Sequence, residues 1–523
     1  MTKYKIFDFP VNNTTETCEL YTNSIPCESE LCDNDCDNDA SKSQIINSTT
    51  QSQQEKSSEP AQNTSKIIMK PFVCVSDEIV LTVKSEENDF IFAYMQNNKI
   101  CYTEAVYPNG KEVHPQELPF ANGEYVPVVG VPIRELIDSA PDLQATELLE
   151  LLHAHLDKYI DAPETDKEMF IHYILFTWFY PKTNTTPYLR FIGDTGKGKS
   201  RFSKVIADLC FYPITAEGAS TASGILRFKE QWHGTLKIDE ADFNGGAESE
   251  IIKYLNLGFE DGHVFMKTNK ANFKEQEFYN PFGPKIIAMR KPFQDNATEG
   301  RLLSFSPRET NRRDIPANLP PIYEDEVEEI RAIITRFVLF NWNNVDPNNL
   351  IDCSEMDIEP RLKQLAIPLS LTLQLLPDGE ARFKNYITRR QAEIKEMRSQ
   401  SWEGTLFNYV YALAAGYDEP HSDYSQYATN GGVLAVTPSM VGAHFGISAK
   451  SATQTMMSIG MTTESTTLKI PSGSETKSKK TRMYAIPSEQ VWNEIVQRYY
   501  YADEGSDEKP SCPEVLKSKR YLN

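Results

Sequence analysis

The feature that most constrains how this chain folds is an eight-residue segment, GDTGKGKS. It lies between Tyr188–Ile192, a run typical of a buried strand, and Ser200–Leu209, whose apolar residues recur with helical spacing. The segment fits GxxxxGK[ST], in which glycines let backbone N–H groups surround a phosphate at a helix N-terminus. A Gly-rich turn is the alternative interpretation. The sequence predicts that these residues bind a nucleotide: Gly193, Asp194, Thr195, Gly196, Lys197, Gly198, Lys199 and Ser200.

A nucleotide-hydrolysing site of this kind also needs a second acidic strand end. Lys199 is expected to reach the β- and γ-phosphates, and the Ser200 hydroxyl to bind Mg²⁺. In GTLKIDEADF, Asp239 is expected to hold Mg²⁺ through water and Glu240 to activate the attacking water. Asp242 is a second candidate acid, and a surface acidic turn is the alternative. Lys237 is unusual in a strand that is expected to be buried.

Two arginines follow the next predicted strand, which contains Ile286–Met289. Arg290 stands at the strand end, where ATPases with a central γ-phosphate sensor usually carry Asn, Thr or Ser. Arg301 lies about ten residues past the strand, where an arginine finger can reach a neighbouring subunit's nucleotide. An ordinary surface charge is the alternative interpretation of each.

Residues 263–279 predict a hairpin inserted just before this strand. Lys267, Lys270 and Lys274 are expected around its tip, where they would grip a single strand together with Phe265 or Phe273. A solvated loop is the alternative.

The YLRFIGDTGKGKS, DEADF and FGPKIIAMRKPFQDNATEGR segments, in this order, resemble the AAA+ ATPases of archaeal and bacterial mobile elements. Those proteins are described as primase–helicases or replication helicases and are related to superfamily 3 and minichromosome-maintenance helicases. The resemblance covers about Asp166–Leu376. It implies an oligomeric ring, commonly a hexamer, that moves on DNA, and makes Arg361 a candidate lid arginine at the γ-phosphate. Residues 1–165 contain no primase carboxylate motif and no zinc ribbon.

The C-terminal third has the pattern of a winged helix. TPSMVGAHFGISAKSATQTMMSIGM predicts a helix–turn–helix, with Lys450 and Gln454 facing the major groove. Two strands with a loose basic loop follow, and a last helix ends the pattern. Winged helices also bind proteins, which is the alternative. The cations expected to bind DNA in this wing are Lys477, Lys479, Lys480 and Arg482.

The expected fold class is α/β, a P-loop AAA+ core whose parallel sheet has helices on both faces. A small β-rich domain precedes this core and a winged helix follows it. Residues 1–66 are polar, acidic and poor in apolar residues, which favours disorder. Their four cysteines include no CxxC pair, so zinc is the minor alternative. The expected parts are 1–66, an acidic tail; 67–134, the β-rich domain; 135–380, the ATPase with a helical lid; 381–500, a helical linker and the winged helix; and 501–523, a flexible tail.

Composition limits the classes of function. The net charge of -21 argues against non-specific coating of nucleic acid, although it leaves room for local basic patches. The longest apolar run, Met169–Tyr180, is too short to cross a bilayer, and the N-terminus has no signal-peptide pattern. These features predict a cytoplasmic protein without membrane contact. The expected function is a ring-forming DNA helicase or translocase that uses ATP and Mg²⁺ in replication, in a mobile element. The alternatives are an ATP-switched DNA-binding initiator or regulator without processive unwinding, and a protein-remodelling ATPase.

Overall fold

The computed structural model describes residues 67–75, 78–217, 221–239, 246–268, 276–420, 434–472, 475–500, 510–519 and 521. The chain divides into two compact units. The first comprises Met1–Asp352 and Leu365–Gly379, and the second comprises Cys353–Gln364 and Glu380–Asn523. The predicted acidic tail, residues 1–66, lies outside the described residues.

The first unit is built on a five-stranded parallel sheet, in the order β10-β11-β14-β9-β15. Each strand is short and largely buried, as expected of a sheet covered on both faces. The strands are β9 (Tyr188–Ile192), β10 (Ile214–Glu217), β11 (Leu236–Asp239), β14 (Lys285–Met289) and β15 (Leu302–Phe305). The strand that ends at Met289 therefore lies between the strand before GDTGKGKS and the strand that ends at Asp239.

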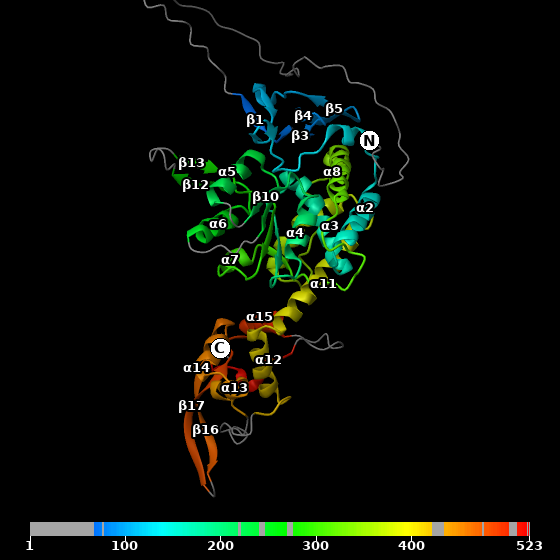
Figure 1. Ribbon diagram of the computed structural model, residues 1–523. Helices are drawn as coiled ribbons and strands as arrows, with labels where there is room; N and C mark the ends of the chain where they lie inside the picture. Colours follow the sequence, from blue (N-terminus) through cyan, green and yellow to red (C-terminus); the bar gives the residue numbers. More distant parts are fainter. Residues whose placement is uncertain are drawn as a thin grey trace, which may run out of the picture. The chain divides into compact units, whose positions relative to one another are not determined.

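Helices flank this sheet (Figure 1), which confirms a mixed α/β core. Helix α4 packs against β9, β11 and β14, and α5 packs against β10. Helix α3 is buried almost all round, because its sequence MFIHYILFTWF is apolar on every face. The helices of this unit are α1 (Arg134–Ser139), α2 (Ala145–Tyr159), α3 (Glu164–Phe179), α4 (Lys199–Ala207), α5 (Ala222–Trp232), α6 (Gly246–Leu257), α7 (Asn296–Glu299), α8 (Ile322–Asn341) and α10 (Ser370–Leu373), whereas most of α9 (Pro360–Ala366) belongs to the second unit.

A four-stranded antiparallel sheet precedes the α/β core. It consists of β2 (Phe72–Val75), β3 (Glu78–Lys84), β4 (Phe90–Gln96) and β5 (Lys99–Thr103). Asn97 and Asn98 connect β4 and β5 with φ of 50° and 60°, the conformation of a tight hairpin turn. This sheet belongs to the same compact unit as the parallel sheet, and the Tyr212 hydroxyl donates to the Thr82 carbonyl at 2.7 Å.

The second unit holds the predicted helix–turn–helix elements. Thr437 caps α13 by accepting from the Met440 N–H, Gly446 ends it with φ of 65°, and Ser448 caps α14. The elements are α11 (Gly379–Ser399), α12 (Trp402–Ala415), α13 (Pro438–Phe445), α14 (Ala449–Ser458), β16 (Thr462–Ser472), β17 (Glu475–Ala485) and α15 (Glu489–Tyr499).

Part of the expected flexible tail is packed against this second unit. The Ile486 N–H donates to the Leu516 carbonyl at 2.6 Å, and the Trp492 indole donates to the Pro510 carbonyl at 2.9 Å. Leu516 is fully buried, and Cys512 and Leu516 belong to the hydrophobic core of this unit. In the part of the chain that the structure describes, no helix combines the length and hydropathy of a membrane span.

Candidate nucleotide-binding site

The loop between β9 and α4 is shaped by three glycines. Gly193, Gly196 and Gly198 have φ of 150°, 86° and 83°, values that residues with a Cβ rarely adopt. Helix α4 begins at Lys199, directly after this loop, so its first N–H groups point into the turn. The Lys199 ammonium donates to the Asp194 carbonyl at 2.7 Å. The loop is therefore a concave set of backbone donors beside a lysine, the arrangement that binds phosphate oxygens.

The structure brings the loop together with the predicted acidic strand end. The Ser200 hydroxyl, in α4, donates to an Asp239 carboxylate oxygen at 3.1 Å, although β14 separates β11, which ends at Asp239, from β9, which precedes the loop. A hydroxyl and a carboxylate are hard oxygen ligands, which fit Mg²⁺ because it retains waters and takes few protein ligands. No group of three or more His, Cys, Asp or Glu that would hold a metal is found among the described residues. Glu240 and Asp242 lie outside those residues.

Arg290 follows the central strand at the same edge of the sheet as this loop. Met289 pairs with Ile192, and the Gly193 N–H donates to the Met289 carbonyl at 3.4 Å. Arg290 is exposed. The position next to Gly193 is suitable for a side chain that senses the terminal phosphate, although the residue is an arginine.

Arg301 lies at the other end of the parallel strands, where they begin. It directly precedes β15, and its carbonyl accepts from the N–H of Tyr188, the first residue of β9. Tyr188 and Ile192, the first and last residues of β9, are four residues apart, so the two ends of the strand are separated by about 13 Å. The Arg301 guanidinium donates to the Ala297 carbonyl at 2.5 Å and lies over the Phe259 ring, and its Nε is buried without a hydrogen-bond partner. Arg301 therefore points away from the loop of its own chain.

A buried arginine, paired with a partly exposed glutamate, supports the strand that carries the loop. Arg190, in β9, donates to both oxygens of Glu299, at 2.5 and 2.8 Å, and to the Ser304 hydroxyl at 3.0 Å. These contacts join β9 to α7 and to β15. This role was not predicted from the sequence, where its signal is a single arginine within the apolar run YLRFI.

The segment after β15, residues 306–317, contacts the loop and is called the strap below. The Lys197 ammonium pairs with Glu309 at 2.8 Å, and Arg201 donates to the Pro316 and Ala317 carbonyls at 3.1 and 2.6 Å. The contact of Glu309 with the loop was not predicted, because this glutamate carries no motif.

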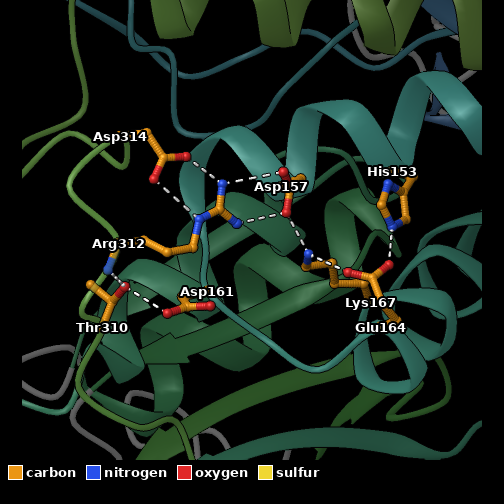
Figure 2. A network of polar contacts seen from close by, with 8 residues as sticks. All are labelled: His153, Asp157, Asp161, Glu164, Lys167, Thr310, Arg312 and Asp314. Carbon is orange, nitrogen blue, oxygen red and sulfur yellow. Dashed lines mark hydrogen bonds and ion pairs between the residues drawn. The ribbon is translucent and has the colours of Figure 1, made fainter.

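The strap is also joined to α2 and to the turn before α3 (Figure 2). Arg312 donates to both oxygens of Asp157, at 2.7 and 3.2 Å, and the Thr310 hydroxyl donates to Asp161 at 2.6 Å. Hydrogen bonds from Arg312 and from Lys167 lower the pKa of Asp157 to about 2. This carboxylate is therefore ionised at neutral pH and fixes the strap beside α2.

The predicted hairpin is present as β12 (Phe265–Thr268) and β13 (Gln276–Tyr279). Two expectations for it are corrected. Lys267 is not at the tip, because it donates to the Ser223 hydroxyl at 2.6 Å and pairs with Glu250. Phe265 is buried against Tyr254 and is not available to bases. Lys270, Phe273 and Lys274 lie outside the described residues.

The outer face of this hairpin is apolar and exposed. Val264, Met266 and Phe278 are exposed by 57%, 62% and 61%, and Met266 is paired with Phe278 across the two strands. The alternation of the strands places Phe265 and Lys267 on the inner face.

Two buried lysines hold the base of the hairpin. The Lys285 ammonium donates to the Pro281 and Gly283 carbonyls, each at 2.8 Å, and Lys229 donates to the Phe282 carbonyl at 3.0 Å. Burial lowers the pKa of Lys229 to about 7 and that of Lys285 well below its ordinary value. Neither lysine was predicted to be buried, because lysine is rarely fully buried.

The predicted DNA-binding residues of the second unit are exposed. Lys450 and Gln454 share one side of α14, four residues apart. The four wing cations lie in strand β17 and not in a loose loop, which corrects that expectation. Arg361, in α9, donates to Gln364 at 2.7 Å; because it belongs to the second unit, its proposed contact with phosphate stays a prediction.

A parallel α/β sheet with this loop at one strand end has the features of a P-loop-like core. No protein-family model matches the chain, and no curated protein matches it. Similar solved structures include the NrS-1 C-terminal region, with 12% identity, a TM-score of 0.34, and coverage of 78% of this chain and 96% of that one. The SCCmec type IV Cch helicase has 7% identity and a TM-score of 0.36, with coverage of 80% of this chain and 79% of that one. The JCV helicase has 14% identity and a TM-score of 0.24, with coverage of 52% of this chain and 64% of that one. All three TM-scores are below 0.5, so the interpretation of the site rests on the geometry of this chain.

Proposed function

We propose that this chain is an ATP-hydrolysing DNA helicase or translocase that forms a ring of identical subunits and serves replication of a mobile element. One observation carries the proposal, the 3.1 Å hydrogen bond between Ser200 and Asp239. A glycine-rich turn that binds no nucleotide has no need of an acidic strand end beside its terminal hydroxyl. A P-loop ATPase needs both groups at one point.

Each residue of this site has a separate role in phosphate transfer. Ser200 and Asp239 hold Mg²⁺, which when bound offsets charge on the phosphates during transfer. Lys199 exchanges its contact with the Asp194 carbonyl for phosphate oxygens. Glu240, the residue after Asp239, orients the attacking water and accepts its proton. Arg290 senses the terminal phosphate from the end of β14.

Arg301 completes the site of a neighbouring subunit. It lies about 13 Å along the sheet from the loop of its own chain, so it supplies positive charge in trans or not at all. This division requires a closed ring, because only closure gives every site a neighbour. A hexamer is the ring size we propose.

The test is ATP hydrolysis by the full chain with no DNA, with single-stranded DNA and with duplex DNA. Lys199→Ala is expected to abolish hydrolysis under all three conditions. Lys270→Ala is expected to keep the basal rate and lose stimulation by single strands. Lys253→Ala is the matched control, since Lys253 is an exposed lysine of α6 with no assigned role, and it is expected to behave as wild type.

An ATP-switched initiator or regulator is the second candidate, favoured by the exposed cations of β17 beside the helix–turn–helix elements. Unstimulated turnover, together with tight duplex binding that survives Lys270→Ala, would establish this candidate in place of the translocase. A rate that no DNA alters, without duplex binding, would leave only a protein-remodelling ATPase.

A further inference from the structure

The two strands β16 and β17 form a long ribbon whose register sorts its side chains onto two faces. Ser465 pairs with Arg482 and Thr467 pairs with Lys480. Residues two apart on one strand share a face, so these four side chains lie together. All four are exposed. Each can donate a hydrogen bond, two are cations, and none is a carboxylate.

The opposite face of the ribbon has a different character. It carries Leu468, which is 2% exposed and pairs with Lys479. It also carries Thr466 paired with Thr481, both half-buried. Directly opposed side chains on a ribbon lie within contact distance, so the aliphatic stem of Lys479 flanks the buried leucine. Lys477 shares this face, two residues before Lys479.

Helix α14 supplies little charge of its own. Its sequence, AKSATQTMMS, contains Lys450 as its one cation, so this helix neutralises few phosphates. The eleven residues of each ribbon strand extend over roughly 36 Å, about one turn of B-DNA, and a two-stranded ribbon fits the major groove.

We propose that the face formed by Ser465, Thr467, Lys480 and Arg482 binds the phosphate backbone of duplex DNA and supplies the salt-dependent part of its affinity. The inference deepens the proposed function, since it assumes that the chain acts on DNA. The four side chains include no aromatic ring for base stacking, and the next residue along this face, Tyr484, is fully buried. This composition favours duplex over single strands. The face also lacks the tyrosine and tryptophan side chains that, together with arginine, dominate the binding energy of protein interfaces.

The test compares two double variants that remove the same charge from the same strand. Lys480→Ala/Arg482→Ala changes the proposed face, and Lys477→Ala/Lys479→Ala changes the opposite one. Dissociation constants for a 30-base-pair duplex are measured with the full chain between about 50 and 200 mM KCl, the range over which phosphate contacts dominate. Thermal unfolding of both variants shows whether each is folded.

The first variant is expected to reduce the slope of log affinity against log salt by about 1.8, or 0.9 for each phosphate contact. The second is expected to change it by less than about 0.5. Equal changes in both variants would overturn the proposal, because diffuse charge rather than one face would then be responsible. An unchanged slope in the first variant, with loss of binding to poly-L-glutamate, would overturn it in favour of an acidic protein partner.

Stimulation of ATP hydrolysis by single strands is measured on the wild type in the same preparations. If stimulation is present and the slope of the first variant is unchanged, the ribbon inference fails alone. If stimulation is absent but the slope falls as expected, the proposed translocase fails and the ribbon inference stands.

Discussion

The Ser200 hydroxyl and the Asp239 carboxylate meet at one point, and each has a separable effect. Asp239→Asn keeps a hydrogen-bond acceptor for the Ser200 hydroxyl but removes the charge that attracts Mg²⁺. We expect it to lower ATP hydrolysis at least about 100-fold, the scale of losing one electrostatic contact to a transition state, and to raise the Mg²⁺ concentration for half-maximal rate. Hydrolysis is followed over a Mg²⁺ titration, and a wild-type titration curve would refute the assignment of Asp239.

Lys229 makes folding stability depend on pH. Its pKa is about 7 in the folded chain, because burial disfavours the ammonium, and about 10.4 in an unfolded chain. Between these values the unfolded chain binds one more proton, so the free energy of unfolding rises with pH through this window. Lys285 acts in the same direction.

We therefore expect the free energy of unfolding to rise with pH more steeply in the wild type than in Lys229→Met. The difference in slope is expected to be about 1.4 kcal/mol per pH unit between pH 8 and 10. Urea denaturation at several pH values measures this difference, and the other titrating groups cancel in the comparison. Parallel pH profiles for the two proteins would contradict the burial of this amine.

At the scale of the element, the hairpin of β12 and β13 places two phenylalanines in opposite surroundings. Phe265 is 8% exposed and Phe278 is 61% exposed. Phe265→Ala should lower the free energy of unfolding by about 3 kcal/mol, since it leaves a cavity against Tyr254. Phe278→Ala, its matched control, should change it by less than about 0.5 kcal/mol. Chemical denaturation distinguishes the two, and equal effects would show that the hairpin faces are reversed.

The strands of the hairpin could be predicted from the sequence, but the direction of their side chains could not. Its two strands were predicted because turn residues separate short apolar runs. The inward direction of Phe265 and Lys267 was not, because the phase of a strand depends on what packs against it. Gly193, Lys199, Ser200 and Asp239 could be predicted as candidate site residues because they follow a motif with fixed spacing, and the structure brings Ser200 and Asp239 into contact.

The buried amines of Lys229 and Lys285 were missed for a different reason. They bind backbone carbonyls at the base of the hairpin, and carbonyls leave no mark in a sequence pattern. The basic part of β17 was predicted as a loose loop between two strands, because its serines, threonines and lysines are typical of loops.

At the scale of the whole molecule, the opposite positions of the loop and Arg301 predict that two inactive variants restore each other. Lys199→Ala lacks a phosphate ligand, and Arg301→Ala lacks the group offered to its neighbour. In a mixed ring of equal parts, about a quarter of the sites combine an intact loop with an intact neighbouring arginine. ATP hydrolysis should therefore return on mixing to about that fraction of wild type. The control is each variant at doubled concentration, and no recovery in the mixture would exclude action in trans.

The amine of Lys229 has a consequence for chemical labelling. An amine with a pKa near 7 is largely unprotonated at pH 8, and so it is intrinsically nucleophilic, yet here it is fully buried. An acylating reagent such as acetic anhydride reaches it only when the base of the hairpin opens. Its acetylation rate, measured by mass spectrometry with and without nucleotide, therefore reports how often the base of the hairpin opens.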